Sequence, residues 1–517
     1  MLPFFCKINR IFITFAPLFG KMVVIIPKEA FILKKIIAIF CLLAMLLPLC
    51  ACSSSLAAEE TKTAESTAEE TKPADEKKKG PITYPDTFAV GYSLIDISTV
   101  PLPMYDATAE TIHDPIMLTV TAISDGKGGV ALIMSADLKG MKKNVFDRSA
   151  ELIEKKFGIP AQNIMINCTH THSAPTVGGD SPELARWSAK DYKQLPIVVE
   201  EALRDLDPVE GAFIGKSTAS GISFVRRYHL EGGGFRTNAK ASQKPIAHES
   251  VADPELRTLR FDRKNKKDVL MVNYQTHYGG ATGLYPAQLS ADFILPFRQQ
   301  AEKKFDCLFA YQSGAGGNIN FNSAIPGEDP FPTLIEAIPE FVRATEEALS
   351  KEEKAELGEI RSAASIYSAT VKKDSEERVR QALECQSAGW ESELGISLLK
   401  KYGFETKYDA SHTISRNREK GETEDVNFSA IGFGDISFAA FPYEMFDTNG
   451  KEVRDGSPYK MTFICSLTNG SMGYMPSALA FTNGSYEVLS CPYVPGCGEE
   501  FAQEGIRLLN ECKNANN

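Results

Sequence analysis

The sequence contains few of the residues that mark several common classes of protein. Its 517 residues include seven histidines and two tryptophans, and 67 acidic residues outweigh 56 basic ones, giving a formal net charge of −11. No basic stripe with interleaved aromatic residues is present, and a net negative charge repels a polyanion. The composition therefore argues against nucleic acid as a partner.

The cysteines follow none of the familiar patterns. Of eleven cysteines, seven follow Cys52, an odd number with no repeated CxxC spacing. Neither a disulfide framework nor a zinc ribbon fits this distribution. Cys491 and Cys497 flank the turn "PYVPG" and are close enough in sequence to pair. The sequence alone leaves that pairing open.

The N-terminal segment has the layout of a secretory signal. Two lysines at 34–35 precede the apolar stretch "IIAIFCLLAMLLPLCAC". The tetrad at 49–52, followed by "SSS", resembles a bacterial lipobox, which implies a lipid on Cys52. A transmembrane anchor is the alternative, but Pro48 and the two cysteines favour the lipoprotein signal. We predict a signal peptide with lipobox at 1–52, and a protein on the bacterial cell surface or elsewhere outside the cytoplasm, anchored to the membrane by that lipid.

Residues 53–83 are predicted to form a disordered tether. The stretch from 53 to 80 contains one leucine and no aromatic residue. It cannot bury enough apolar surface to offset the entropy lost on ordering. The folded domain is therefore expected at 84–517.

Within this domain the pattern alternates strands with helices. Helical periodicity is found at 142–158, 191–207, 294–305 and 333–350, and strand patterns are found at 87–98, 116–125, 128–137, 161–173, 211–230, 255–263, 268–277, 426–446 and 460–477. The charged stretch from Lys351 to about Arg418 is expected to be a peripheral insertion or a helical connector. The fold class is predicted as α/β, of the mixed α+β kind.

Rare polar residues stand at the ends of these predicted strands. His170 and His172 follow "NIMI" in "NCTHTHS", and alternation along a strand sends both to one face. Asp137, His277 and Glu444 follow other strands. Ligands in open α/β sheets bind beyond the carboxyl ends of the strands, so these side chains are expected to converge. Two imidazoles and a carboxylate would suit zinc with one position left open.

Each of these residues also has a simpler interpretation when taken alone. An isolated H-x-H pair is often no more than two polar residues at a strand end, and His277 could be a hydrogen-bonded core histidine. Glu444 could cap the following helix, and Asp137 could accept backbone donors. The zinc hypothesis depends on the residues occurring together.

Two loops rich in small residues also follow strands. "YQSGAGGNINFN" and "SLTNGSMGYMPS" could present backbone N–H groups to an anion or a developing oxyanion, although an ordinary tight turn explains either loop. The first loop lacks the Gly-Lys-Ser/Thr ending of a Walker loop, which argues against nucleotide binding.

Several of these segments together resemble one enzyme family. "NIMINCTHTHSAPT", "VNYQTHYGG" with "SADF", "GAGGNINFN", "FPYEMF" and "GYMPSALAFTNGSYEV" stand in the order found in the neutral, non-lysosomal ceramidases and their bacterial relatives. The likeness runs from about Phe88 to the C-terminus and covers the catalytic domain only. It implies a multi-layer catalytic domain at 84–517, with the active site at the carboxyl ends of its strands.

The resemblance also implies a zinc-dependent hydrolysis of the amide of N-acylsphingosines, in which metal-activated water attacks the carbonyl. By position in the motifs, the zinc ligands would be His170, His277, Glu444 and Tyr486. His172 would be a catalytic histidine beside the metal, Tyr474 a catalytic tyrosine, and Arg226 the active-site arginine, with Arg227 as the other candidate. The substrate would then be a ceramide-like lipid.

One position departs from the family pattern. The ceramidases carry a serine in the first glycine loop, described as the nucleophile or as a residue at the scissile amide, and Asn320 occupies that position here. Asparagine cannot act as that nucleophile. Two alternatives therefore stay open: a zinc hydrolase of another amide or ester, and a surface lipoprotein that binds a lipid or glycan without turnover.

Overall fold

The computed structural model describes residues 80–104, 107–179, 181–277, 284–328 and 330–514. Gly80–Asn517 is one compact unit. The predicted signal peptide with its lipobox cysteine, and the predicted tether up to residue 79, lie outside the described residues. Among the helices of the described part, none is long and apolar enough to cross a membrane.

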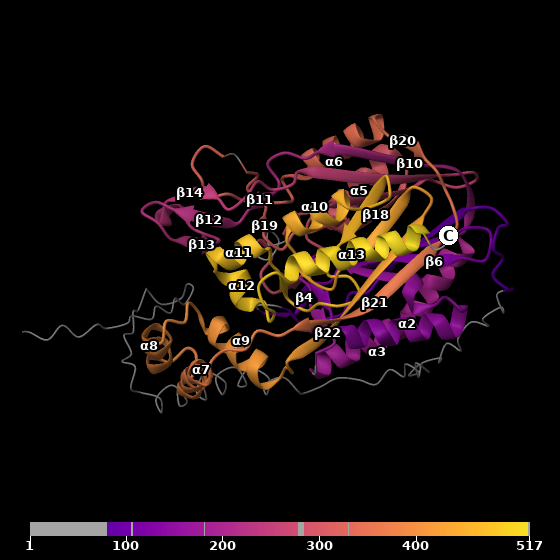
Figure 1. The fold of residues 1–517 in the computed structure, drawn as a ribbon. Helices are drawn as coiled ribbons and strands as arrows, with labels where there is room; N and C mark the ends of the chain where they lie inside the picture. The colour runs from indigo at the N-terminus through magenta and orange to yellow at the C-terminus, as the bar shows by residue number, and fades with distance from the viewer. Residues whose placement is uncertain (1–79, 105–106, 180, 278–283, 329, 515–517) are drawn as a thin grey trace, which may run out of the picture. The chain divides into compact units, whose positions relative to one another are not determined.

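A mixed nine-stranded sheet forms the centre of this unit (Figure 1). Its strand order is β18-β16-β15-β10-β1-β5-β6-β8, and β20 also pairs with β10. The pairs β6–β8 and β16–β18 are parallel, and the other pairs are antiparallel. The strands are β1 Ala89–Asp96, β5 Met117–Ser124, β6 Val130–Ala136, β8 Ile164–Cys168, β10 Asp207–Thr218, β15 Glu255–Arg263, β16 Val269–Tyr274, β18 Leu308–Ser313 and β20 Glu353–Ala355.

A four-stranded sheet, ordered β21-β22-β23-β25, packs against the large one. Its strands are β21 Arg361–Thr370, β22 Thr423–Phe433, β23 Ile436–Ala440 and β25 Met461–Cys465. Small ladders lie near the carboxyl ends of these strands, and those used below are β11 Phe224–Val225, β12 Arg227–Leu230, β13 Phe235–Thr237, β14 Pro245–His248, β19 Ile319–Asn320, β24 Glu444–Met445 and β26 Tyr474–Met475.

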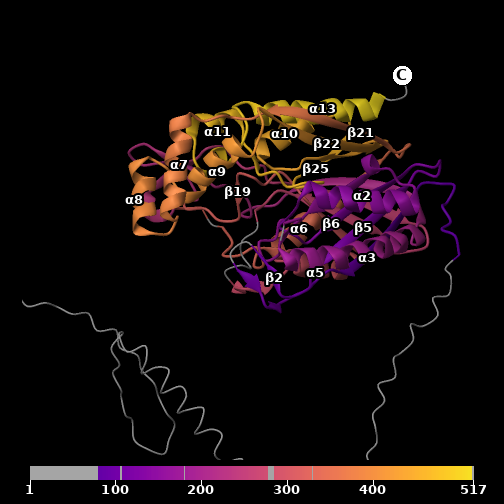
Figure 2. The ribbon, with the colours of Figure 1, turned by 90° about the horizontal axis from the view of Figure 1, so that it is seen from below.

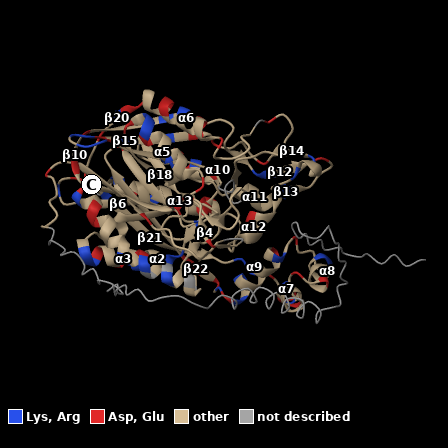
Figure 3. Cartoon of the chain, turned by 180° about the vertical axis from the view of Figure 1, so that it is seen from behind, with Lys and Arg blue, Asp and Glu red and all other residues tan. Residues whose placement is uncertain are grey.

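Five helices cover the outer faces of the two sheets: α2 Lys143–Phe157, α3 Pro182–Arg204, α5 Ile294–Phe305, α6 Ile338–Ser350 and α13 Cys497–Asn514. Three others, α7 Glu376–Ala388, α8 Glu393–Lys401 and α9 Lys407–Arg418, pack on one another in a core of their own beside the sheets (Figure 1). The other helices named below are α10 Asp447–Asp455, α11 Ala478–Asn483 and α12 Tyr486–Ser490. Basic and acidic side chains are interspersed on the outer helices (Figure 3), where pairs such as Lys143–Asp147 and Arg343–Glu347 stand four residues apart.

Separate apolar cores show that the fold has four layers, which Figure 2 shows edge-on from α13 to α3 and α5. Alternate residues of β6 enter different cores: Leu132 and Met134 pack under α2 and α3, whereas Ile133 packs between the two sheets. A further core joins the small sheet to α13. Burial on both faces explains why β6 reads as a continuous apolar run.

These observations confirm the predicted mixed α/β class and its multi-layer form. The expected strand at 128–137 is β6, and the expected helix at 142–158 is α2, which ends at Gly158 with φ +71°. The stretch from Lys351 to Arg418 is only partly helical, because it also contributes the ten-residue strand β21. That strand was missed because its sequence, "RSAASIYSAT", lacks apolar alternation, and Ile366 within it is 69% exposed.

The carboxyl end of β8 is where the two sheets meet. Asn167 accepts a hydrogen bond from the Ser313 N–H at the end of β18, 2.7 Å away, and donates one to the Thr468 hydroxyl beyond β25, 2.9 Å away. The strands at the two ends of the order β18 to β8 are thus joined by one buried amide side chain. The segments that follow these strands consequently lie close together.

Candidate metal centre

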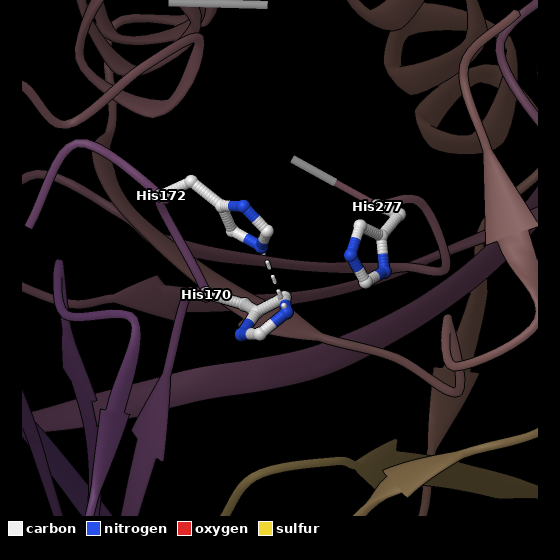
Figure 4. A group of neighbouring side chains, drawn as sticks. All are labelled: His170, His172 and His277. Carbon is white, nitrogen blue, oxygen red and sulfur yellow. Dashed lines mark hydrogen bonds between the residues drawn. The ribbon is translucent and has the colours of Figure 1, made fainter. Parts of the chain in front are cut away.

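Three histidine rings gather beyond β8 and β16 (Figure 4). His170 and His172 follow β8, and His277 follows β16. The ring centroids lie 4.8 Å apart for His170–His172, 4.8 Å for His170–His277 and 5.3 Å for His172–His277. One nitrogen from each ring falls within 4.8 Å of the others, which is a separation suited to a shared metal ion. The expected convergence of these three side chains is therefore present.

The backbone at His170 is shaped to point its ring inward. Its φ is +68°, a left-handed conformation that residues other than glycine adopt seldom, with histidine among those that adopt it more often. The ring Nδ1 lies 2.7 Å from the Lys139 carbonyl oxygen, so Nδ1 is the donor in this contact and Nε2 is the nitrogen that faces the other residues of the group. Nε2 faces His172 Nε2 at 3.3 Å and Glu444 Oε2 at 3.4 Å. A backbone carbonyl that fixes the tautomer in this way is typical of a metal-binding histidine.

Glu444 supplies a carboxylate to the same place. Its Oε2 lies 3.4 Å from His170 Nε2 and 3.9 Å from His277 Nδ1, and it is buried without a hydrogen-bond partner among the described residues. Burial by itself raises the pKa of this carboxyl, but His170 and Arg226 attract its charge, and the net result is a pKa below the usual value. An ionised carboxylate oxygen with no hydrogen bond is suited to a cation.

His172 and His277 are in the neutral form that binds metal. Burial lowers the pKa of His172 well below 6.5, and the neighbouring His170, Lys139 and Arg226 lower it further. Burial also lowers the pKa of His277, with Arg226 and His170 adding to the effect, while its Nδ1 lies 3.3 Å from the Gly316 carbonyl oxygen. Both rings are therefore neutral at pH 7, as ligation requires.

Two of the separations match those expected around one ion, and that between His277 Nδ1 and Glu444 Oε2, at 3.9 Å, is somewhat longer. Ligand atoms about 2.0–2.2 Å from a tetrahedral zinc ion lie about 3.3–3.6 Å from one another. His170 Nε2 to Glu444 Oε2, at 3.4 Å, and His170 Nε2 to His172 Nε2, at 3.3 Å, both fall in this range. Nitrogen and carboxylate donors of this kind suit zinc, so the residues present fit the metal implied by the sequence.

Tyr474 and Tyr486 lie beside the carboxylate. β24 and β26 pair in parallel with Glu444 opposite Tyr474, and the ring of Tyr486, the first residue of α12, lies 5.5 Å from that of Tyr474. Burial and the Glu444 charge raise the pKa of Tyr474 well above 10, and they raise that of Tyr486 in the same direction. Both phenols are therefore protonated here and can donate hydrogen bonds. If Tyr486 were a metal ligand, the metal would have to displace the proton of its hydroxyl.

Arg226 faces this group of residues, and Arg227 does not. The Arg226 Nη2 donates to the Tyr474 hydroxyl at 3.1 Å and to the Gly317 carbonyl at 2.8 Å. The fully buried Arg227 instead donates to Glu249 at 2.7 and 2.9 Å and to Glu487 at 2.8 Å. Of the two candidate arginines, Arg226 is the one placed to act on a bound molecule.

Glu487 was missed by the sequence analysis. It is fully buried, and its Oε1 accepts from Arg226 Nε at 2.8 Å while its Oε2 accepts from Arg227 Nη1 at 2.8 Å and from Thr237 Oγ1 at 2.6 Å. It directly follows Tyr486 in "SYEV", and that local sequence does not mark it as buried. Glu487 therefore positions Arg226 against Tyr474.

Asn320 and Asp137 have other partners. Asn320 ends β19, where its Nδ2 donates to Asn238 at 3.3 Å and its Oδ1 accepts from the Phe321 N–H at 2.9 Å. Asp137 accepts from the Met117 N–H at 3.0 Å, and burial raises its pKa to about 6. This hydrogen bond agrees with the simpler of the two interpretations of Asp137, in which its carboxylate accepts a backbone donor.

The glycines of the first loop allow close approach of the backbones that carry the ligands. A Cβ on Gly316 would lie 2.6 Å from the Thr276 carbonyl oxygen, and a Cβ on Gly317 would lie 2.2 Å from that of Glu444. The Gly317 N–H donates to Met445 at 2.8 Å. Because this N–H already bonds a backbone carbonyl, it is not available to an anion. The loop instead packs between the segments that carry His277 and Glu444.

Replacing Gly317 with alanine is expected to move Glu444. The new methyl group would meet backbone atoms that cannot rotate away, an overpacking that costs about 1–3 kcal/mol. Thermal unfolding should shift downward, and the zinc retained after dialysis should fall. Gly421→Ala is the matched control, since its Cβ would come no nearer than 3.3 Å to other atoms. Unchanged zinc content in Gly317→Ala would contradict this role of the loop.

Comparison with known proteins agrees with this geometry at the level of fold. The structure matches that of neutral ceramidase from Pseudomonas aeruginosa with a TM-score of 0.62 and 16% sequence identity, over 83% of this chain and 75% of that one. A second structure, of a ceramidase complexed with C2, matches with a TM-score of 0.61 and 15% identity, over 83% of this chain and 76% of that one. This chain has the neutral ceramidase fold. No protein-family model matches the sequence, and no curated protein matches it either. The ceramidase fold thus accounts for the layers and sheets described above, while the chemistry has to be argued from the site residues.

Proposed function

We propose that this protein is a zinc-dependent amide hydrolase of the neutral ceramidase type, acting on a ceramide-like N-acyl lipid. The observation that carries the proposal is the convergence of His170, His172, His277 and Glu444 at one point of a ceramidase fold. The proposed zinc ligands are His170, His277 and Glu444, with Tyr486 as the fourth. A bound zinc ion would activate water and polarise the amide carbonyl.

The other residues of the site supply hydrogen bonds and proton transfer. His172, neutral and beside the proposed ligand His170, is placed to accept a proton from water and pass it to the leaving amine. Tyr474 and Arg226 can donate hydrogen bonds to the oxygen of the amide as negative charge develops on it. Arg226 is held for this task by Glu487.

A second candidate function has one observation in its favour. Asn320 lies at the position of the ceramidase serine. Its side chain is hydrogen-bonded to the Asn238 side chain and to the backbone N–H of Phe321. A zinc hydrolase of another amide or ester would need no serine there. The predicted lipid anchor at Cys52 belongs to either proposal, because it would hold the enzyme at a membrane outside the cytoplasm.

Hydrolysis of a fluorescent N-acylsphingosine by the purified protein tests the first proposal. Release of the fatty acid is expected to stop with 1,10-phenanthroline, to persist with the non-chelating 1,7 isomer, and to return when zinc is added. Zinc-loaded protein that hydrolyses simple amides or esters but not the sphingolipid would favour the second candidate. Protein that binds zinc and hydrolyses none of these substrates would contradict both.

A further inference from the structure

Two buried cysteines lie side by side, Cys491 directly after α12 and Cys497 at the start of α13. The Sγ atoms of Cys491 and Cys497 are 3.8 Å apart, and their residues are 1% and 2% exposed. All seven cysteines of the described part are buried, and this pair makes the one sulfur–sulfur contact found there. We propose that Cys491 and Cys497 form a disulfide bond that ties α12 to the start of α13.

The backbone around the pair is held in place without the bond. Tyr493, which lies between the two cysteines, is fully buried. Its hydroxyl is hydrogen-bonded to the Tyr443 hydroxyl and to the Glu424 carboxylate, at 2.7 Å in each case. Its backbone forms a β-bridge with Val371. The Cys497 N–H donates to the Val494 carbonyl at 3.3 Å, which closes the turn. A disulfide needs its sulfur atoms about 2.05 Å apart, so the two sulfur atoms have to approach from their present separation of 3.8 Å.

Burial determines when the bond forms. Both thiols are buried in the folded protein, where an external oxidant cannot reach them. The bond therefore forms during folding, before α13 covers the turn. A thiol–disulfide oxidoreductase of an oxidising compartment is the required oxidant: the two cysteines lose two protons and two electrons, and the disulfide of the oxidoreductase is reduced to two thiols.

The bond would stabilise a helix that is too short to be stable alone. α12 has five residues, of which the first two are Tyr486 and Glu487, and its end is closed by the Cys491 N–H donating to the Glu487 carbonyl at 3.0 Å. A covalent link from Cys491 to the eighteen-residue α13 fixes this end. The proposal does not depend on what the site binds or hydrolyses.

Peptide mapping of the full chain, produced with export from the cytoplasm, tests the proposal. Free thiols are blocked with N-ethylmaleimide in denaturant, and the protein is then reduced and labelled with iodoacetamide. Cleavage after glutamate releases residues 488–499 with both cysteines, separately from Cys465. Cys491 and Cys497 are expected to carry the iodoacetamide label and Cys465 the maleimide. Maleimide on both Cys491 and Cys497, or a link from either to another cysteine, would overturn the proposal.

A stability measurement separates this bond from other effects of reduction. Wild-type protein reduced in denaturant and refolded with a reductant should unfold several degrees lower than untreated protein, and the C491A/C497A variant should unfold at the same temperature after either treatment. Amide exchange in the peptide that contains α12 should be faster in the variant. Equal unfolding temperatures of the wild-type protein after the two treatments would count against the bond.

Discussion

Replacing His170 with alanine is expected to abolish zinc binding and hydrolysis together, whereas replacing His172 should abolish hydrolysis and leave the zinc in place. His170 presents Nε2 to both His172 and Glu444, so its loss removes the nitrogen at the centre of the group. His172 is proposed to transfer protons, a contribution worth about 10²–10⁴-fold in rate. Metal analysis and hydrolysis rates of the two purified variants measure the difference.

The control for this experiment is His229→Ala. His229 is exposed on β12, and its ring packs on Phe235 at 5.1 Å. Zinc content and rate should both equal those of the wild-type protein. Loss of zinc from His172→Ala would show that His172 is itself a ligand, which its 3.3 Å separation from His170 Nε2 would also suit. Full zinc content in His170→Ala would contradict the proposed centre.

Replacing Glu487 with alanine is expected to be the most destabilising single change near the site. Glu487 accepts hydrogen bonds from Arg226 and Arg227, and all three side chains are at most 4% exposed. Removing one partner of a buried ion pair costs about 3–5 kcal/mol, because the remaining charge has no compensation. Chemical denaturation measures this loss, and the hydrolysis rate should fall with it because Arg226 is no longer held against Tyr474.

Glu249→Ala separates stability from positioning. Glu249 binds Arg227 and Asn483, and it has no hydrogen bond to Arg226 in the described part of the chain. This variant should also lose stability, but it should keep most of its turnover at a temperature where both variants are folded. Equal loss of turnover in the two variants would mean that Glu487 acts only through the fold.

The sequence predicted those features that depend on local pattern. β6 and α2 were predicted because apolar residues recur with the period of a strand or a helix. The expectation that His170, His277 and Glu444 meet was possible because residues after strands gather at one edge of a sheet. β21 was missed since Ala and Ser carry little hydrophobic contrast, and its identity as a strand comes from pairing with β22.

Features that depend on three-dimensional proximity could not be predicted. Glu487 has two arginine partners about 260 positions away, and nothing in "SYEV" distinguishes a buried carboxylate from one that is exposed. The choice between Arg226 and Arg227 likewise required the fold, because adjacent residues of an extended chain point in opposite directions. The left-handed backbone at His170 also has no signature in "NCTHTHS".

The hydrogen bonds of Asn167, which connect the ends of β8, β18 and β25, have a consequence for the order of folding. Asn167 bonds Ser313, 146 positions away, and Thr468, 301 positions away. Contacts this distant in sequence form late, since long loops must close first. The proposed metal-binding group brings together segments that follow these strands, so a chain stalled before the contacts form is expected to have no place for zinc. The metal content of a preparation would then measure the fraction of its chains that have finished folding.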